Sequence, residues 1–240
     1  MTNASRIFLG LLTATAGALL AVWLNLPLPW MIGALLATAI SKMGGSPGVS
    51  HRLFRNGGQW VIGASLGLYF TPDMVRLIGV NLPYILAGTV FAIGLGGLGT
   101  YILRTLGGAD FKTAWFASAI GGASEMTSLA ERHHARADLV ASAHSLRMLM
   151  VVIIIPFAFR ALDIHGNDAS VQARVAFFDA GGLLTLIVLT SVMGAVFQRL
   201  RLPNAWVLGP LLATALLTSQ DIVFTLLPVE LTNLGQLLIG

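Results

Sequence analysis

Four stretches of this chain are apolar over about the length that crosses a lipid bilayer. They are Ile7–Leu24, Pro83–Arg104, Leu139–Leu162 and Val175–Leu200. A helix needs roughly 20 predominantly apolar residues to span the hydrocarbon core, because lipid offers no partner for a free backbone polar group. Only 10% of the residues are charged, against about 25% in soluble domains. We therefore predict an all-α fold, a polytopic bundle of membrane helices.

Shorter apolar segments lie between these four. They are Trp30–Met43, Gly57–Phe70, Lys112–Leu129, Trp206–Thr218 and a segment that begins near Leu231. Apolar runs of this length occur as short spans, re-entrant segments or interfacial helices. The predicted bundle therefore contains short or broken helices.

The chain carries an internal duplication. Residues 21–40 align without gaps on residues 197–216 with ten identities, among them Pro27/Pro203, Trp30/Trp206 and Gly33/Gly209. Further on, Gly58–Gly63 and Gly235–Gly240 share four of six residues. The pattern predicts a tandem repeat with a period of about 176 residues.

We divide the chain into a first repeat, residues 1–163, and a second, residues 175–240, with six membrane segments expected in each complete copy. The second copy stops where the first has about 100 residues still to run, so we expect a truncated piece of a protein of about 340 residues. Six spans per copy would make the copies parallel in the membrane. One re-entrant segment would invert one copy relative to the other.

The most unusual stretch is the apolar segment that Gly121 and Gly122 interrupt. Paired glycines are poor helix formers, and Ser124 is a residue type that caps helices, which would place Glu125 in a first turn. A helix broken inside a bilayer exposes backbone groups that can hold a substrate. An intramembrane carboxylate by default indicates an ion or proton pathway. The alternative is that Glu125 lies at the interface and simply stabilises a helix end.

The next segment supplies a possible partner for this carboxylate. Arg147 lies about two turns into an otherwise apolar span and needs a counter-ion, and we expect Glu125 to provide it. His144 precedes Arg147 by three residues, a helical spacing. The pair Glu125 and Arg147 is interpreted either as a substrate site or as a structural salt bridge.

Two glutamines recur at the same place in both copies. Gln59 and Gln236 each follow a glycine in the repeated Gly-Gln-x-x-Ile-Gly element. Short segments in matching positions of two repeats indicate a substrate pathway between them. The alternative is that each amide bonds to a neighbouring backbone. The full set of candidate substrate-binding residues is Gln59, Gly121, Gly122, Ser124, Glu125, His144, Arg147 and Gln236.

Several classes of function find no support in the residues. The chain has no Cys, so thiolate metal sites and cysteine nucleophiles are excluded. We expect no metal site, no cofactor and no enzymatic activity. Basic residues occur singly rather than as a stripe, so nucleic acid is not an expected partner.

Several motifs of this chain resemble the bacterial AbrB-type membrane protein family. They are the duplicated Leu-Pro-x-x-Trp-x-x-Gly-x-Leu-Leu-Ala element and the stretches Trp115–Ala119, Gly121–Met126, Ala130–Arg132 and Ser145–Arg147. The resemblance covers essentially the whole chain. It implies the duplication that members share and a length near the one inferred above. Members often carry the labels ammonia monooxygenase or regulator.

Three functions follow as hypotheses. The leading one is a transporter or permease for a small polar or ionic substrate, because duplicated halves with broken helices are typical of secondary transporters. The alternatives are a membrane-embedded AbrB-type regulator of gene expression and an ammonia monooxygenase-like protein. The expected location is the bacterial inner membrane, where several spans are surrounded by lipid. The protein is expected to be a monomer or a homo-oligomer. Slightly more basic residues fall in the loops on the N-terminal side, which favours a cytoplasmic N-terminus.

Overall fold

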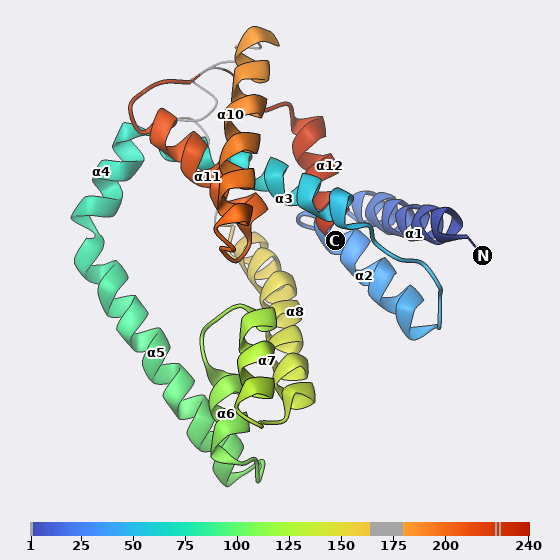
Figure 1. Cartoon of the computed structure of the whole chain (residues 1–240), viewed down its shortest axis with the longest axis vertical. Helices are drawn as coiled ribbons and strands as arrows, with labels where there is room; N and C mark the ends of the chain where they lie inside the picture. The colour runs from blue at the N-terminus through green and yellow to red at the C-terminus, as the bar shows by residue number, and fades with distance from the viewer. Residues whose placement is uncertain (1, 164–179, 224, 226) are drawn as a thin grey trace. The chain divides into compact units, whose positions relative to one another are not determined.

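The computed structural model describes residues 2–163, 180–223, 225 and 227–240. Within these ranges the protein consists of helices joined by short loops, without a β-strand (Figure 1). In chain order the helices are α1 (Asn3–Trp23), α2 (Pro29–Met43), α3 (Arg52–Gly67), α4 (Pro72–Val80), α5 (Leu82–Thr105), α6 (Phe111–Ser118), α7 (Ala123–Arg132), α8 (Ala137–Ala161), α10 (Ala180–Arg199), α11 (Ala205–Thr218) and α12 (Val229–Ile239). The predicted all-α class is confirmed.

Among the residues that the structure describes, four helices are long and apolar enough to cross a membrane: α1, α5, α8 and the Gly181–Arg199 part of α10. They coincide with the four long apolar stretches of the sequence, although residues 175–179 of the last stretch lie outside the described residues. In α5 only 6% of the most apolar window is buried inside the protein. An apolar helix with so little protein cover is suited to hydrocarbon rather than to water.

The shorter segments form shorter helices, as expected. Helices α3 and α4 are together apolar enough for one span but are bent by 78° at the break between them. This pair is a broken span or a re-entrant segment, and α11 is a further short apolar helix.

The helices divide into two compact units. One unit comprises Met1–Arg76 with Pro156–Gly240, and the other comprises Leu77–Ile155. The first unit thus combines parts of both predicted repeats. The predicted start of the second repeat, residue 175, lies outside the described residues, and the repeat boundaries stay a prediction.

Within the first unit the same helix pair occurs twice. Helix α1 packs along α2, and α10 packs along α11 (Figure 1). Each turn holds residues in the left-handed region at matching places: Asn25 and Leu28 in the first pair, Arg201 and Asn204 in the second. The sequence identity between residues 21–40 and 197–216 is therefore matched by an equivalent turn geometry.

Glycines allow both pairs to pack closely. A Cβ atom on Gly33 would lie 2.8 Å from the Cα of Ala18, and one on Gly209 would lie 2.7 Å from the Cα of Gly194. Such distances leave no room for any side chain at these positions. Small residues at helix contacts are typical of membrane proteins, where close van der Waals packing holds helices together.

The third helix of each copy packs on the helix pair of the other copy. Helix α3 lies against α11, and α12 lies against α2. A Cβ on Gly63 would lie 3.0 Å from the Cα of Val207, and one on Gly240 would lie 3.1 Å from the backbone nitrogen of Leu35. The two third helices also cross each other, where a Cβ on Gly58 would lie 2.7 Å from the carbonyl oxygen of Gly235. The first unit is therefore built by an exchange of helices.

Candidate functional site

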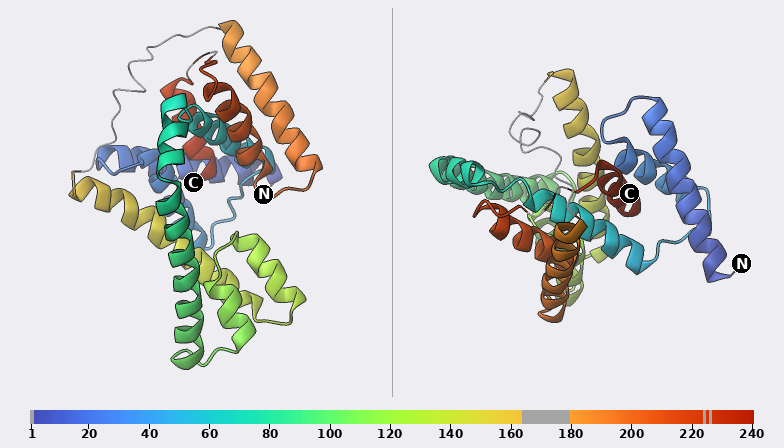
Figure 2. Two further views of the ribbon diagram at one scale, coloured as in Figure 1. Left: turned by 90° about the vertical axis from the view of Figure 1, so that its left-hand side faces the viewer. Right: turned by 90° about the horizontal axis from the view of Figure 1, so that it is seen from above.

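The predicted break in the apolar segment lies in the second unit. Helix α6 ends at Ser118 and α7 begins at Ala123. The linking residues are extended: Ala119 has φ −58° and ψ 146°, and Gly122 has φ −65° and ψ 138°. Figure 2 shows the two short helices side by side, beside α5. Gly121 and Gly122 thus lie in the break, as the sequence predicted.

The carboxylate of Glu125 folds back over the start of α7. Gly122, and not Ser124, is the N-cap residue, which corrects the prediction made from the preference of serine for caps. Glu125 lies in the first turn, and the Ser124 hydroxyl donates a hydrogen bond of 3.0 Å to its Oε2 atom. A Cβ on Gly122 would lie 2.9 Å from the carboxyl carbon of Glu125. The helix dipole favours a negative group here.

Helix α8 holds the other end of the break, the C-terminus of α6. His144 is fully buried, and its Nε2 atom lies 2.9 Å from the carbonyl oxygen of Phe116. Arg147 is half-buried, and its guanidinium donates a 3.2 Å hydrogen bond to the carbonyl oxygen of Ala119. The last carbonyls of a helix have no partner within the helix, so α8 supplies the groups that satisfy them.

The two side chains of α8 also bind each other. A guanidinium nitrogen of Arg147 lies 2.9 Å from Nδ1 of His144. Since arginine has only donors, Nδ1 must accept, and the ring hydrogen therefore sits on Nε2, where it is donated to Phe116. The chain of hydrogen bonds runs from Arg147 through His144 to α6, which fixes the imidazole in one tautomer.

The prediction of an ion pair between Glu125 and Arg147 is wrong. Among the described residues the ion pair is Arg136–Asp138, and Arg147 is instead bound by the carbonyl of Ala119 and by His144. Carbonyl dipoles at a helix C-terminus carry partial negative charge, so they can take the place of a carboxylate. Glu125 and Arg147 each occupy one end of the break.

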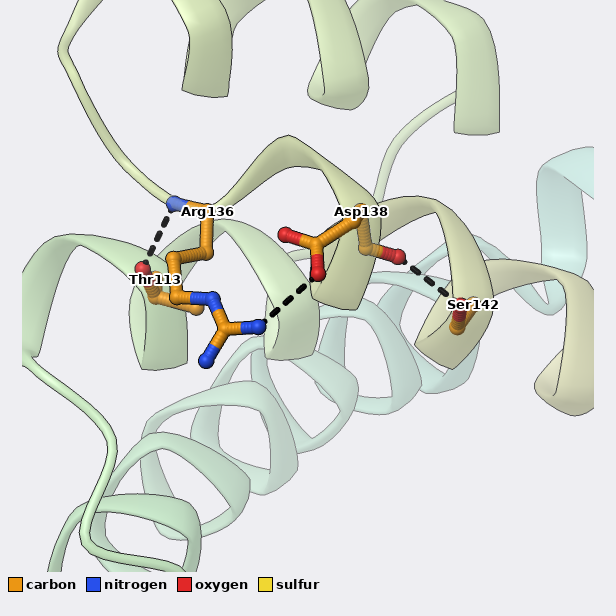
Figure 3. Close-up of polar contacts among 4 residues, drawn as sticks. All are labelled: Thr113, Arg136, Asp138 and Ser142. Carbon is orange, nitrogen blue, oxygen red and sulfur yellow. Dashed lines mark hydrogen bonds and ion pairs between the residues drawn. The ribbon is translucent and has the colours of Figure 1, made fainter.

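A frame of polar contacts joins α6 to the start of α8. The backbone N–H of Arg136 donates to Thr113, which is buried, at 2.9 Å, and the Arg136 guanidinium pairs with Asp138 at 2.9 Å (Figure 3). Ser142 donates back to the carbonyl of Asp138 at 2.8 Å. These contacts position α8, and with it His144 and Arg147, against α6.

The start of α6 is capped in the same region. The Asp110 side chain accepts a 3.1 Å hydrogen bond from the backbone N–H of Thr113. Hydrogen bonds from Thr113 to the charged form, first from its side chain, hold the pKa of Asp110 below its usual value. The cap and the frame both depend on Thr113, so this residue fixes the start of α6.

Gln59 and Gln236 belong to the first unit. They lie on α3 and α12, directly after Gly58 and Gly235, the two glycines where these helices cross. Both side chains are half-buried. The structure thus brings Gly121, Gly122, Ser124 and Glu125 together at one end of the break and His144 with Arg147 at the other, and it places the two glutamines in the other compact unit.

We expect alanine at position 122 to displace the Glu125 carboxylate and leave the fold intact. The added Cβ would occupy the space of Oε2, while φ and ψ of Gly122 suit any residue. The displaced carboxyl group should react several-fold faster with a hydrophobic carbodiimide, measured by mass spectrometry with Glu131 as the internal reference. Gly121→Ala is the control, because its Cβ would meet the flexible side chain of Met126. Equal rates in all three proteins would contradict this arrangement.

These features define an all-α protein with membrane-type helices, a duplicated helix pair and a polar helix break. The chain belongs to the AbrB family: the family model described as "Transition state regulatory protein AbrB" matches residues 30–240. It is 27% identical over 221 residues to "Putative regulator AbrB" of Escherichia coli (strain K12), which covers 90% of this chain and 62% of that protein. It is also 27% identical over 177 residues to "Uncharacterized protein YhjN" of Bacillus subtilis (strain 168), covering 69% of this chain and 45% of that protein.

The chain therefore spans less than two thirds of the length of these relatives. No solved structure matches it.

Proposed function

We propose that the protein is a membrane transporter or permease for a small polar or ionic substrate, with the break between α6 and α7 as its site. One observation carries this proposal: both ends of a broken helix are occupied by charged side chains, Glu125 at the start of α7 and Arg147 at the end of α6. Transporters bind substrates and coupling ions at the ends of discontinuous helices. The four long apolar helices support a place in a membrane with several spans, and the bacterial origin of the relatives makes the cytoplasmic membrane the expected one.

The two charged groups have different freedom to move. Arg147 is bound to Ala119 and to His144, which is itself buried and bound to Phe116. Glu125 is half-buried, and its carboxylate accepts a hydrogen bond from the hydroxyl of its neighbour Ser124. Glu125 is therefore the group that can exchange its partners. We assign it the role of binding a cation or a proton, and we assign His144 and Arg147 the role of positioning α6.

The test is transport by purified protein in liposomes. We expect a substrate-induced current from a panel of ammonium, organic anions and amino acids, and we expect Glu125→Gln to abolish it, since the amide cannot ionise. Glu131→Gln is the matched control, because Glu131 lies in the same helix but is exposed in its last turn. Unchanged helicity of both variants by circular dichroism would show that folding is intact.

Either of two results would count against the proposal. Flux that survives Glu125→Gln would remove Glu125 from the site. Absence of flux in both electrical and isotope-uptake assays would favour the second candidate function, that of a membrane-embedded regulator. That candidate is favoured by the family description and by the name of the Escherichia coli relative. It predicts that deletion of the gene changes the expression of other genes. Addition of transport substrates should not alter this change.

A further inference from the structure

The first unit contains a cavity that the proposed transport site does not use. Its volume is about 380 Å³, within the range of about 300–1,000 Å³ typical of ligand sites. The walls are the first half of α1, the second half of α2, residues 46–50, the start of α3 and the end of α12. All of these segments belong to one compact unit.

A tightly packed loop forms one wall. The Arg6 side chain donates a 2.9 Å hydrogen bond to the carbonyl of Pro47, and the N–H of Val49 donates a 3.1 Å bond to the carbonyl of Arg6. A Cβ on Gly10 would lie 2.9 Å from the carbonyl oxygen of Val49. The wall is therefore pre-formed, which lowers the cost of ordering it when a ligand binds.

The lining has an apolar part and a cationic part. Ile7, Leu11, Leu35 and Leu238 contribute apolar surface, while Lys42 and His51 contribute the basic groups. Nδ1 of His51 accepts a hydrogen bond from the N–H of Leu53, which leaves Nε2 as the donor. The lining includes no Asp or Glu, and Lys42 forms no ion pair in the part of the chain that the structure describes.

The second copy serves as an internal control for these charges. In the first copy the cavity is lined by the basic residues Lys42 and His51, and Arg52 and Arg55 follow them in the chain. The aligned residues in the second copy are Thr218, Pro228, Val229 and Thr232. Both copies build the same helix pair, so the pairing of the two helices does not require these positive charges.

We infer that this cavity binds an amphiphile with an anionic head group, a phosphate or carboxylate held by Lys42 and His51, with its apolar chain against α1 and α2. Basic pockets between membrane helices are typical sites for anionic lipid head groups. A soluble anion could supply the same head-group chemistry, and the experiment separates the two sources.

The experiment is ligand-induced thermal stabilisation of the full chain in a non-ionic detergent, followed by its tryptophan fluorescence. A ligand that binds the folded state raises Tm by an amount that grows with the logarithm of its concentration divided by its Kd. The probes are phosphatidylglycerol, phosphatidylcholine and inorganic phosphate. We expect phosphatidylglycerol to stabilise the protein and phosphatidylcholine to have no effect. Lys42→Gln should weaken the apparent affinity about fivefold, the effect of one basic residue near an anionic surface.

Two matched variants make the result specific. Lys42→Arg keeps the charge and should bind like the unaltered protein. Arg76→Gln removes one charge from an exposed position on α4 that does not line the cavity, and it should leave the affinity unchanged. If inorganic phosphate alone stabilises the protein with the same dependence on Lys42, the head-group site is supported and its source is a soluble anion. Equal stabilisation by both lipids, or unaltered binding by Lys42→Gln, would overturn the inference.

Discussion

Replacing Gly33 with alanine is expected to destabilise the first unit by about 1–3 kcal/mol, the usual cost of overpacking a close contact. The new Cβ would lie 2.8 Å from the Cα of Ala18 and would also meet the carbonyl oxygen of Gly17. Both obstacles are backbone atoms of α1, so relief requires the two helices to separate. The equivalent change in the second copy, Gly209→Ala, should have an effect of similar size, because its Cβ would lie 2.7 Å from the Cα of Gly194.

The free energy of unfolding, from titration of mixed micelles with a denaturing detergent, measures this effect. Gly57→Ala is the control in the same unit: no atom lies within 4 Å of its Cβ, and the position is inside α3. Alanine there should stabilise the helix by up to about 1 kcal/mol. If Gly33→Ala unfolds no more easily than Gly57→Ala, α1 and α2 do not pack as described.

Replacing Arg147 with methionine is expected to destabilise the second unit by about 1–3 kcal/mol, because it leaves an acceptor of the buried His144 and the half-buried carbonyl of Ala119 without donors. The substitution removes the hydrogen bonds to the carbonyl of Ala119 and to Nδ1 of His144. Methionine keeps much of the length of the side chain, so the change acts mainly through the lost donors. The C-terminus of α6 should fray, seen as faster hydrogen exchange of Ala119, whose N–H bonds to the carbonyl of Trp115.

The comparison with Arg136→Met separates this effect from loss of charge alone. Arg136 pairs with Asp138 at the surface, both side chains being 65% exposed, and such pairs contribute about 0–1 kcal/mol. A double-mutant cycle with His144→Leu should show that the Arg147 and His144 effects are coupled rather than additive. Additive effects, or equal losses at positions 136 and 147, would contradict the hydrogen-bonded chain.

The membrane helices could be predicted because the signal is length and hydrophobicity alone. Each long apolar stretch became a helix within a few residues of its expected bounds, apart from the residues that the structure does not describe. The break between α6 and α7 could also be predicted from the sequence, since Gly121 and Gly122 interrupt an apolar run. These features depend on residues near one another in the sequence, where local chemistry decides the conformation.

The partners of the charged groups could not be predicted in the same way. The expected counter-ion of Arg147 was the carboxylate of Glu125, yet the structure uses the carbonyl oxygen of Ala119 and the Nδ1 atom of His144. Backbone acceptors are present at every residue and leave no mark in the sequence. The cavity beside Lys42 was missed for a related reason: its walls come from both ends of the chain. A lone lysine in the last turn of α2 is typical of any helix C-terminus.

The exchange of third helices has a consequence for how the chain is made. Helix α3 leaves the ribosome early, but its partner α11 follows about 140 residues later. At about 5–20 residues per second, that interval is roughly 7 to 30 seconds. During this time Gly63 lacks its partner Val207 on α11, and Gly235 on α12, the partner of Gly58, is made later still. Insertion of α3 must therefore precede its packing, and helices of the second copy complete a part of the fold that the first copy begins.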